Sequence, residues 1–156
     1  MKNKFTRDDF YDSPDYSKSS ILASELPEDA CLCNITTTGS YKSLFLSISS
    51  KLPDHHNLTK GSEVYFWVQD GGIYISFGKQ PRLVQFFSSK LQGLPQRNGS
   101  YSYRCTLPLR FCKDNAINNT HCFTLIKKAE GVYYADISIQ ARYTANRPYS
   151  PKTEDY

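Results

Sequence analysis

The chain has 156 residues and a formal net charge of +4, a length typical of a single domain. Hydrophobic residues make up 39% of it and aromatic residues 14%, which is enough for one real core. Its Lys and Arg residues are scattered without a run of like charges, which excludes the basic groove of a nucleic-acid-binding protein. No apolar run approaches the roughly 18–20 residues that span a bilayer, so we expect no transmembrane segment.

The two ends of the sequence differ from its middle. Residues 1–29 are polar and show no hydrophobic period, so we expect a flexible N-terminal arm. Residues 144–156 contain Pro148, Pro151 and mixed charges, and we expect a C-terminal tail. The sequence therefore predicts one folded domain over residues 30–143.

Apolar and polar residues alternate with the period of a half-buried strand, first over residues 44–49. Two further alternating runs, 64–69 and 73–78, are joined by Asp70-Gly71-Gly72. Because glycine tolerates the positive φ of a tight turn, this spacing predicts a β-hairpin.

The second half of the chain continues the same pattern. A short strand is expected over 83–87, followed by a loop near residues 93–99 and a long alternating strand over 101–111. Another strand begins at Phe123, and after a turn at Glu130-Gly131 the alternation resumes over 132–143. Seven or eight strands without a convincing helix predict an all-β fold, a two-sheet antiparallel β-sandwich.

One face of these strands is strongly apolar. Such faces usually pack as a core, but they also suit the lining of a cavity for a lipid or another small hydrophobic ligand. The candidate lining residues are Leu46, Ile48, Phe66, Ile75, Phe77, Leu107, Leu109, Phe111 and Ile137.

N-glycosylation motifs are more frequent than chance predicts. The acceptor residues would be Asn34, Asn57, Asn98 and Asn118, where chance would give roughly one motif. Each falls at an expected strand end or loop, where a glycan could be accepted. Although residues 1–30 show no signal peptide, we interpret the chain as a mature protein that is secreted or lies on the cell surface.

The chain has five cysteines, an odd number, and all lie within the predicted domain: Cys31, Cys33, Cys105, Cys112 and Cys122. At most two intrachain disulfides can form, and the remaining thiol could pair with another chain. We expect Cys112 to pair with Cys122, and Cys105 with Cys31 or Cys33. The alternative is that all five are reduced, buried thiols.

We find no catalytic or metal site in the sequence and expect no cofactor. The cysteine spacing does not match the paired Cys-x-x-Cys hooks of a zinc site. His121 and Cys122 are adjacent, so on a strand their side chains would face opposite sides. There is no phosphate-binding loop, nucleophile elbow or His-Glu-x-x-His helix.

The only tryptophan, Trp67, shares a predicted strand face with Tyr65 and, across the hairpin, Tyr74. These three side chains either make ordinary cross-strand pairs or form an exposed aromatic patch for a protein partner.

The C-terminal strands resemble those of the myeloid-differentiation-related lipid-recognition (ML) domains. The resemblance lies in residues 98–103, in Leu107-Pro108-Leu109 and in Gly131-Val132-Tyr133 followed by Ile137 and Ile139. It implies a secreted β-sandwich whose two sheets hold a lipid between them.

The sequence as a whole favours a non-catalytic extracellular binding domain, such as a receptor ectodomain, a ligand or a secreted effector. Its partner would be another extracellular protein. The alternative is a carrier of a lipid or small hydrophobic ligand between the sheets.

Overall fold

The structure, a computed structural model, describes residues 29–38 and 41–143. The predicted tail and all but the last residue of the predicted arm lie outside these ranges. Eight antiparallel strands confirm the all-β prediction: β1 (Ala30–Thr38), β2 (Tyr41–Ile48), β3 (Glu63–Gln69), β4 (Gly72–Phe77), β5 (Phe86–Pro95), β6 (Tyr101–Leu107), β7 (His121–Ala129) and β8 (Val132–Ile139). Within the described ranges, three short helices accompany them: η2 (His55–Asn57), α1 (Leu109–Asp114) and η3 (Ala141–Tyr143). Among the described residues, no helix is long and apolar enough to cross a membrane.

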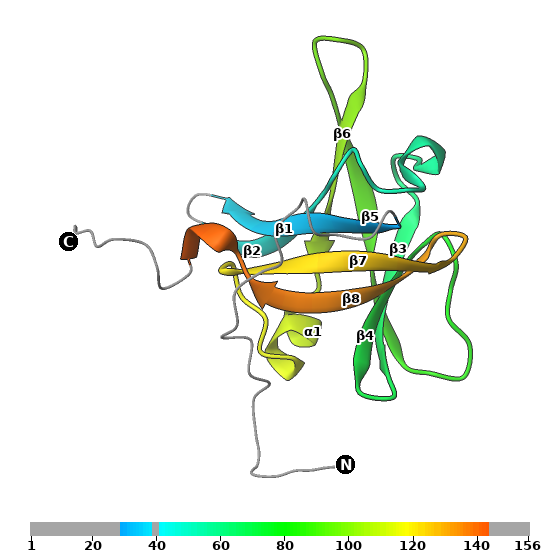
Figure 1. Cartoon of the computed structure of the whole chain (residues 1–156), viewed down its shortest axis with the longest axis vertical. Helices are drawn as coiled ribbons and strands as arrows, with labels where there is room; N and C mark the ends of the chain where they lie inside the picture. Colours follow the sequence, from blue (N-terminus) through cyan, green and yellow to red (C-terminus); the bar gives the residue numbers. More distant parts are fainter. Residues whose placement is uncertain (1–28, 39–40, 144–156) are drawn as a thin grey trace, which may run out of the picture.

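The predicted two-sheet sandwich is wrong, because the strands close into a barrel in the order β1-β2-β6-β5-β3-β4-β8-β7 (Figure 1). The barrel closes because two strands, β1 and β5, each pair with different neighbours along the two halves of their length. The first half of β1, Ala30–Asn34, pairs with β7, and its second half, Ile35–Thr38, pairs with β2. In the same way, β5 pairs with β3 over residues 86–90 and with β6 over residues 91–95. Alternation along a strand shows which face is buried but does not reveal that one strand serves two sheets.

The hairpin predicted from residues 64–78 is confirmed. Strands β3 and β4 pair from Val64↔Phe77 to Gln69↔Gly72. Asp70 and Gly71 form the turn with φ of 53° and 77°, the two positive values that a tight hairpin turn requires.

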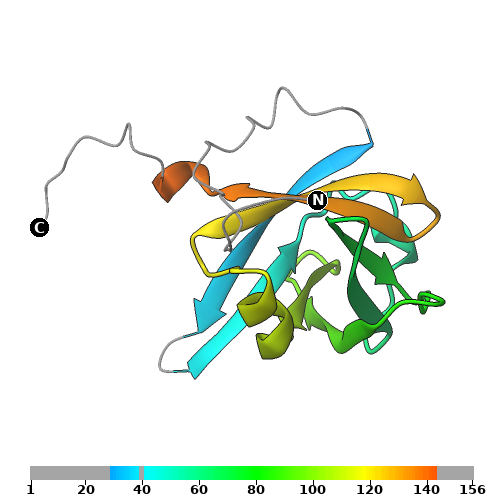
Figure 2. The same ribbon diagram turned by 90° about the horizontal axis from the view of Figure 1, so that it is seen from below.

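The predicted strand over 101–111 ends early, at Leu107, and Leu109–Asp114 forms the helix α1 instead. Pro108 separates the two elements, since it has no N–H to donate to a strand ladder and its fixed φ suits a helix start. Figure 2, which views the molecule from below, shows α1 at the near end of the barrel.

The interior of the barrel is filled by side chains from every strand. Phe66, Phe111, Phe123 and Tyr133 are each fully buried there. Phe111 extends from α1 and packs against Phe66 and Phe87, with ring centroids 5.4 and 5.7 Å apart. Helix α1 therefore closes its end of the barrel with an aromatic side chain.

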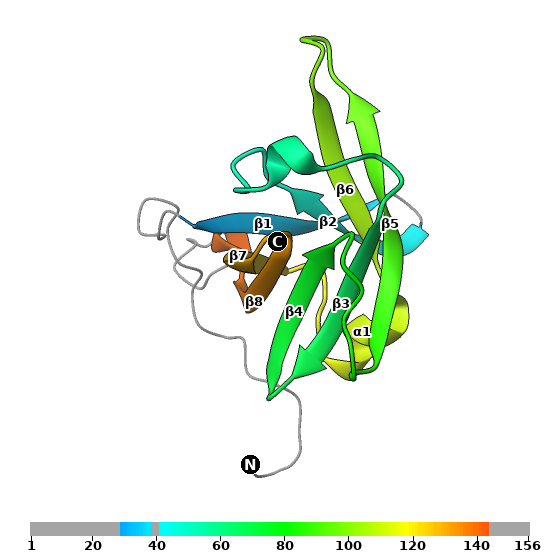
Figure 3. The same ribbon diagram turned by 90° about the vertical axis from the view of Figure 1, so that its right-hand side faces the viewer.

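A connection on the outside of the barrel covers part of β3. Strands β4 and β5 lie on either side of β3 and both run antiparallel to it, so the chain must return along β3 to connect them. Residues 78–85 make this return, and Figure 3 shows them in front of β3, on the outer side of the barrel. The segment begins with a hydrogen bond from the Gly78 N–H to the Glu63 carbonyl. We call residues 78–85 the strap.

Candidate functional site

The described residues offer six features that could carry function: a buried carboxylate, a polar pocket, a pair of thiols, an aromatic row, an apolar groove beside α1 and a projecting hairpin. No group of three or more His, Cys, Asp or Glu side chains in the described part of the chain could hold a metal ion. His121 is buried and its Nδ1 accepts a hydrogen bond from the Asn118 N–H at 2.9 Å. Burial lowers the pKa of His121, so its ring is neutral near pH 7.

Asp54, in the loop between β2 and β3, is the most buried carboxylate described, with 4% of its surface exposed. Its carboxylate accepts hydrogen bonds from Lys127 Nζ (2.8 Å), the Tyr133 hydroxyl (2.8 Å) and the Gly131 N–H (2.9 Å). The Asp54 N–H in turn donates to the Tyr133 oxygen at 3.1 Å. These bonds join residues more than 70 positions apart and attach the β2–β3 loop to the β7–β8 turn.

Burial alone would raise the pKa of Asp54, but the bonds from Lys127, Tyr133 and Gly131 outweigh it and lower that pKa to about 2. Burial and the neighbouring carboxylate raise the pKa of Tyr133. The carboxylate is therefore ionised and saturated with donors, which suits a structural closure rather than a general acid or base. A cavity of about 220 Å³ lies beside it, lined by Asp54, Asn57, Leu58, Phe77, Lys79, Glu130 and Gly131.

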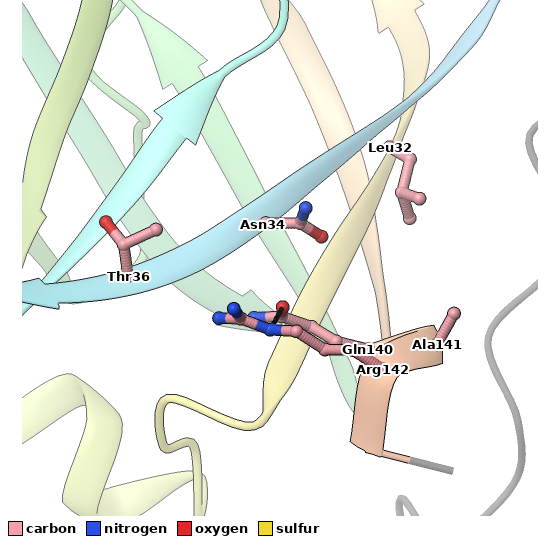
Figure 4. A pocket seen from close by; sticks show the side chains of 6 residues that line it. All are labelled: Leu32, Asn34, Thr36, Gln140, Ala141 and Arg142. Atoms are coloured by element: carbon pink, nitrogen blue, oxygen red, sulfur yellow. Dashed lines mark hydrogen bonds between the residues drawn. The ribbon is translucent and has the colours of Figure 1, made fainter. Parts of the chain in front are cut away.

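A polar pocket of about 330 Å³ lies where the outer face of β1 meets the end of β8 (Figure 4). Leu32, Asn34 and Thr36 line it from β1, and Gln140, Ala141 and Arg142 line it from the chain after β8. The Gln140 amide nitrogen lies 2.8 Å from the carbonyl oxygens of Ile35 and His121. Its amide oxygen accepts a bond from Arg142 Nε at 3.1 Å. Gln140 thus holds the chain after β8 against β1 and orients Arg142.

All four predicted glycosylation acceptors have exposed side chains. Asn57 lies in η2, Asn98 in the β5–β6 turn and Asn118 in the loop before β7, as the loop prediction requires. Asn34 differs, because it lies in the middle of β1 and lines the polar pocket. At Asn98 and Asn118 the side-chain oxygen accepts a 2.6 Å bond from the hydroxyl two residues later.

None of the five cysteines forms a disulfide, and all five are buried. The expected pairs, Cys112 with Cys122 and Cys105 with Cys31 or Cys33, are therefore not formed in the structure. Cys122 instead lies 3.4 Å from the Ser138 hydroxyl. Cys31 and Cys33 share the inner face of β1, with their sulfur atoms 3.8 Å apart.

The aromatic side chains Tyr65, Trp67 and Tyr74 lie together on the outer face of the barrel, as expected. Trp67 stacks on Tyr74 at 5.7 Å, and Tyr65 meets Phe86 edge to face at 5.4 Å. The row continues from Tyr74 to Tyr134 on β8. Trp67 is only 7% exposed although its face of β3 points away from the core, and it stacks on Tyr74 and donates a hydrogen bond to the Gln69 side chain. Little of the Trp67 side chain is therefore accessible to a protein partner.

Most of the predicted cavity-lining residues lie in the packed interior. Leu46, Ile48, Phe66, Ile75, Leu107 and Phe111 belong to one core cluster, and Phe77 and Ile137 pack against it. Leu109 does not, because its side chain is 68% exposed on α1. Leu107 and Leu109 do share a surface groove of about 410 Å³ with Ser43, Leu44, Thr106, Pro108 and Cys112.

A feature that the sequence did not predict is the length of the β5–β6 hairpin, which projects beyond the barrel (Figures 1 and 3). Within the described ranges, the last pair of β6 with β2 is Tyr103↔Ile48, and the last contact of β5 with its other neighbour is at Leu91. Beyond these points the described parts of the two strands pair only with each other, at Leu94↔Ser102 and Pro95↔Tyr101. Tyr101 and Tyr103 belong to the strand predicted over 101–111, and their alternation does not indicate that the strand begins beyond the barrel.

The projecting part of the hairpin carries apolar side chains in solvent. Leu94 is 48% exposed and Tyr101 is 47% exposed. Tyr101 stacks on Tyr103 at 6.0 Å, and Tyr103 in turn meets the His55 ring edge to face at 5.4 Å. A line of rings therefore runs from the barrel end to the projecting part.

Comparisons with known proteins give no assignment for this chain. No family model, no curated protein and no solved structure matches it.

Proposed function

We propose that this chain is a non-catalytic extracellular binding domain that recognises a protein partner through the projecting β5–β6 hairpin. The observation that carries the proposal is the combination of a rigidly rooted hairpin with exposed Tyr101 and Leu94 at its far end. Large aromatic side chains held on a stiff support are typical of the residues that dominate protein–protein binding energy.

The root of the hairpin is held by several contacts, so its exposed end is presented in one orientation. The Tyr103 hydroxyl donates to the Leu58 carbonyl at 3.2 Å, and the Gly61 N–H donates to the Leu91 carbonyl at 2.7 Å. A side chain Cβ at Gly93 would lie 3.3 Å from both Lys60 and Tyr103, so the absence of a side chain there permits this close packing. A pre-ordered surface loses less conformational entropy on binding than a mobile loop.

The exposed hairpin edges favour a protein over a small ligand. Strand edges with unpaired backbone groups can accept an extended segment from another chain. Pro95 lacks an N–H and limits such pairing at the end of β5. We therefore expect side-chain contacts through Tyr101 and Leu94 to supply most of the affinity.

The proposed location outside the cell draws its support from the four exposed acceptor asparagines. The extracellular location predicts that the chain expressed in a eukaryotic secretory host carries N-glycans, seen as a shift to lower mass after glycosidase treatment. Occupied sites at Asn98 and Asn118 would support it. Secretion of a stable chain with every acceptor empty would contradict it.

A binding screen against a panel of displayed receptor ectodomains tests the proposed function. Tyr101→Asp should weaken binding to any partner found by about tenfold or more, because a hot-spot ring is replaced by a charge. Leu83→Asp is the matched control, since Leu83 is fully exposed but lies in the strap. Equal losses from the two variants, or full binding by Tyr101→Asp, would contradict the assignment to the hairpin.

A second candidate function, binding of a small hydrophobic ligand, is supported by the groove beside α1. Its volume of about 410 Å³ lies within the range of ligand pockets, and Leu44, Leu107 and Leu109 give it an apolar lining. Side chains fill the interior of the barrel, so a ligand site inside it, as expected between two sheets, has less support than the groove. Leu109→Asp should abolish the binding of a hydrophobic fluorescent probe if the groove is its site, whereas unchanged probe binding would exclude the groove.

A further inference from the structure

Two of the five thiols lie close enough to react with each other. Cys31 and Cys33 are two residues apart on β1, so both side chains point to the same, inner face. Their sulfur atoms are 3.8 Å apart, and the side chains are 3% and 1% exposed. Two residues of extended strand span about 6.6 Å between Cα atoms, just inside the upper limit of about 6.8 Å at which a disulfide can form.

The backbone around these thiols is held on one edge only. Ala30–Asn34 pair with β7, whereas the described pairs of β1 with β2 begin at Ile35. A strand segment with one hydrogen-bonded edge can pucker more easily than one in the middle of a sheet. The sulfur atoms can therefore approach bonding distance without breaking the ladder that closes the barrel on the β2 side.

The surroundings make the two thiols chemically different. A hydrogen bond from Cys33 and another from Ser49, together with the charge of Lys51, lower the pKa of Cys31 to about 7 despite its burial. The Cys31 bond and burial raise the pKa of Cys33. The pair therefore forms a thiolate more readily at Cys31 than at Cys33.

Cys105 and Cys112 lack these properties. Burial raises the pKa of Cys105 to about 12 and that of Cys112 to about 11. Neither is a nucleophile at neutral pH, because a thiol reacts through its thiolate.

We propose that Cys31 and Cys33 form a reversible dithiol–disulfide site that exchanges with small disulfides. The Cys31 thiolate attacks one sulfur of a disulfide RSSR, which forms a mixed disulfide and releases one thiolate RS⁻. Cys33 then loses its proton and attacks the Cys31 sulfur, which forms the Cys31–Cys33 bond and releases the second RS⁻. The protons of the two cysteines go to the two RS⁻ groups, so the dithiol is oxidised by two electrons and RSSR is reduced to two RSH.

The site is independent of the proposed partner binding.

The test treats the purified full chain with the disulfide form of 2-mercaptoethanol, then unfolds it and counts thiols with an alkylating reagent. We expect the count to fall by two from the five of the reduced chain, and to recover when a reductant is added. The tryptic peptide of residues 19–42 contains Cys31 and Cys33 and no other cysteine, so the internal bond should lower its mass by two hydrogen atoms.

Variants separate this site from the remaining thiols. Cys31→Ala and Cys33→Ala should each abolish the internal bond, while Cys105→Ala, which removes another buried thiol, should leave it intact. The peptide measurement on the unaltered chain does not depend on any variant folding. An unchanged thiol count, or a bond that joins Cys105, Cys112 or Cys122 instead, would overturn the proposal.

Discussion

At the α1 end of the barrel, Phe111 packs against Phe66 and Phe87, whereas at the opposite end a buried carboxylate, Asp54, holds the β2–β3 loop to the β7–β8 turn. The first closure depends on apolar area and shape, and the second on three directed hydrogen bonds to a charge. The comparison shows that one barrel can be closed by two kinds of interaction that respond differently to mutation and to pH.

The largest effect is expected at the apolar end. Phe111→Ala should lower the free energy of unfolding by about 3–5 kcal/mol, because it removes a fully buried ring and leaves a cavity. Urea denaturation followed by far-UV circular dichroism measures the change. A loss below about 1 kcal/mol would mean that α1 does not close the barrel.

A smaller loss, about 2–3 kcal/mol, is expected for Asp54→Ala. The substitution leaves the Tyr133 hydroxyl and the Gly131 N–H without their acceptor. Lys127 limits the loss, since its side chain is 28% exposed and its charge can be hydrated. In the same urea experiment, a larger loss than that of Phe111→Ala would reverse the proposed ranking of the two ends.

Lowering the pH should reduce the stabilisation at the end of the barrel that Asp54 closes, but not at the end that Phe111 closes. The folded pKa of Asp54 is about 2, below the ordinary 3.8, so its contribution is complete above the unfolded pKa and is lost as pH falls toward 2. The loss between about pH 5 and pH 2 should be at most about 2 kcal/mol. The matched control is Asp54→Ala, whose stability should fall less over this pH range. Identical pH profiles for the two chains would contradict the assignment.

The smallest effect is expected for Leu109→Ala, a neighbour of Phe111 in α1. Leu109 is 68% exposed, so its removal should change the free energy of unfolding by less than about 0.5 kcal/mol. A loss comparable to that of Phe111→Ala would show that the whole helix, rather than one ring, closes the barrel.

The sequence predicted local features of this fold better than distant ones. The β3–β4 hairpin could be predicted because its pairing is set by neighbouring residues and by Asp70-Gly71. The end of β6 was missed because Cys105, Leu107 and Phe111 are all buried, and the period alone does not show that Phe111 reaches the core from a helix.

The candidate sites show the same difference between local features, which the sequence predicts, and contacts between distant residues, which it does not. The acceptor asparagines and the shared face of Cys31 and Cys33 follow from spacing. The bond between Asp54 and the Gly131 N–H joins residues 77 positions apart, and no local pattern indicates it. The path of the strap follows from the strand order and not from any local pattern in residues 78–85.

The burial of Trp67 gives the molecule an internal fluorescent reporter. The chain has one tryptophan, it stacks on Tyr74, and the indole Nε1 donates to the Gln69 side-chain oxygen at 3.1 Å. Its emission should be blue-shifted in the native state and protected from acrylamide quenching. Loss of the packing around Trp67 would then be visible as increased quenching.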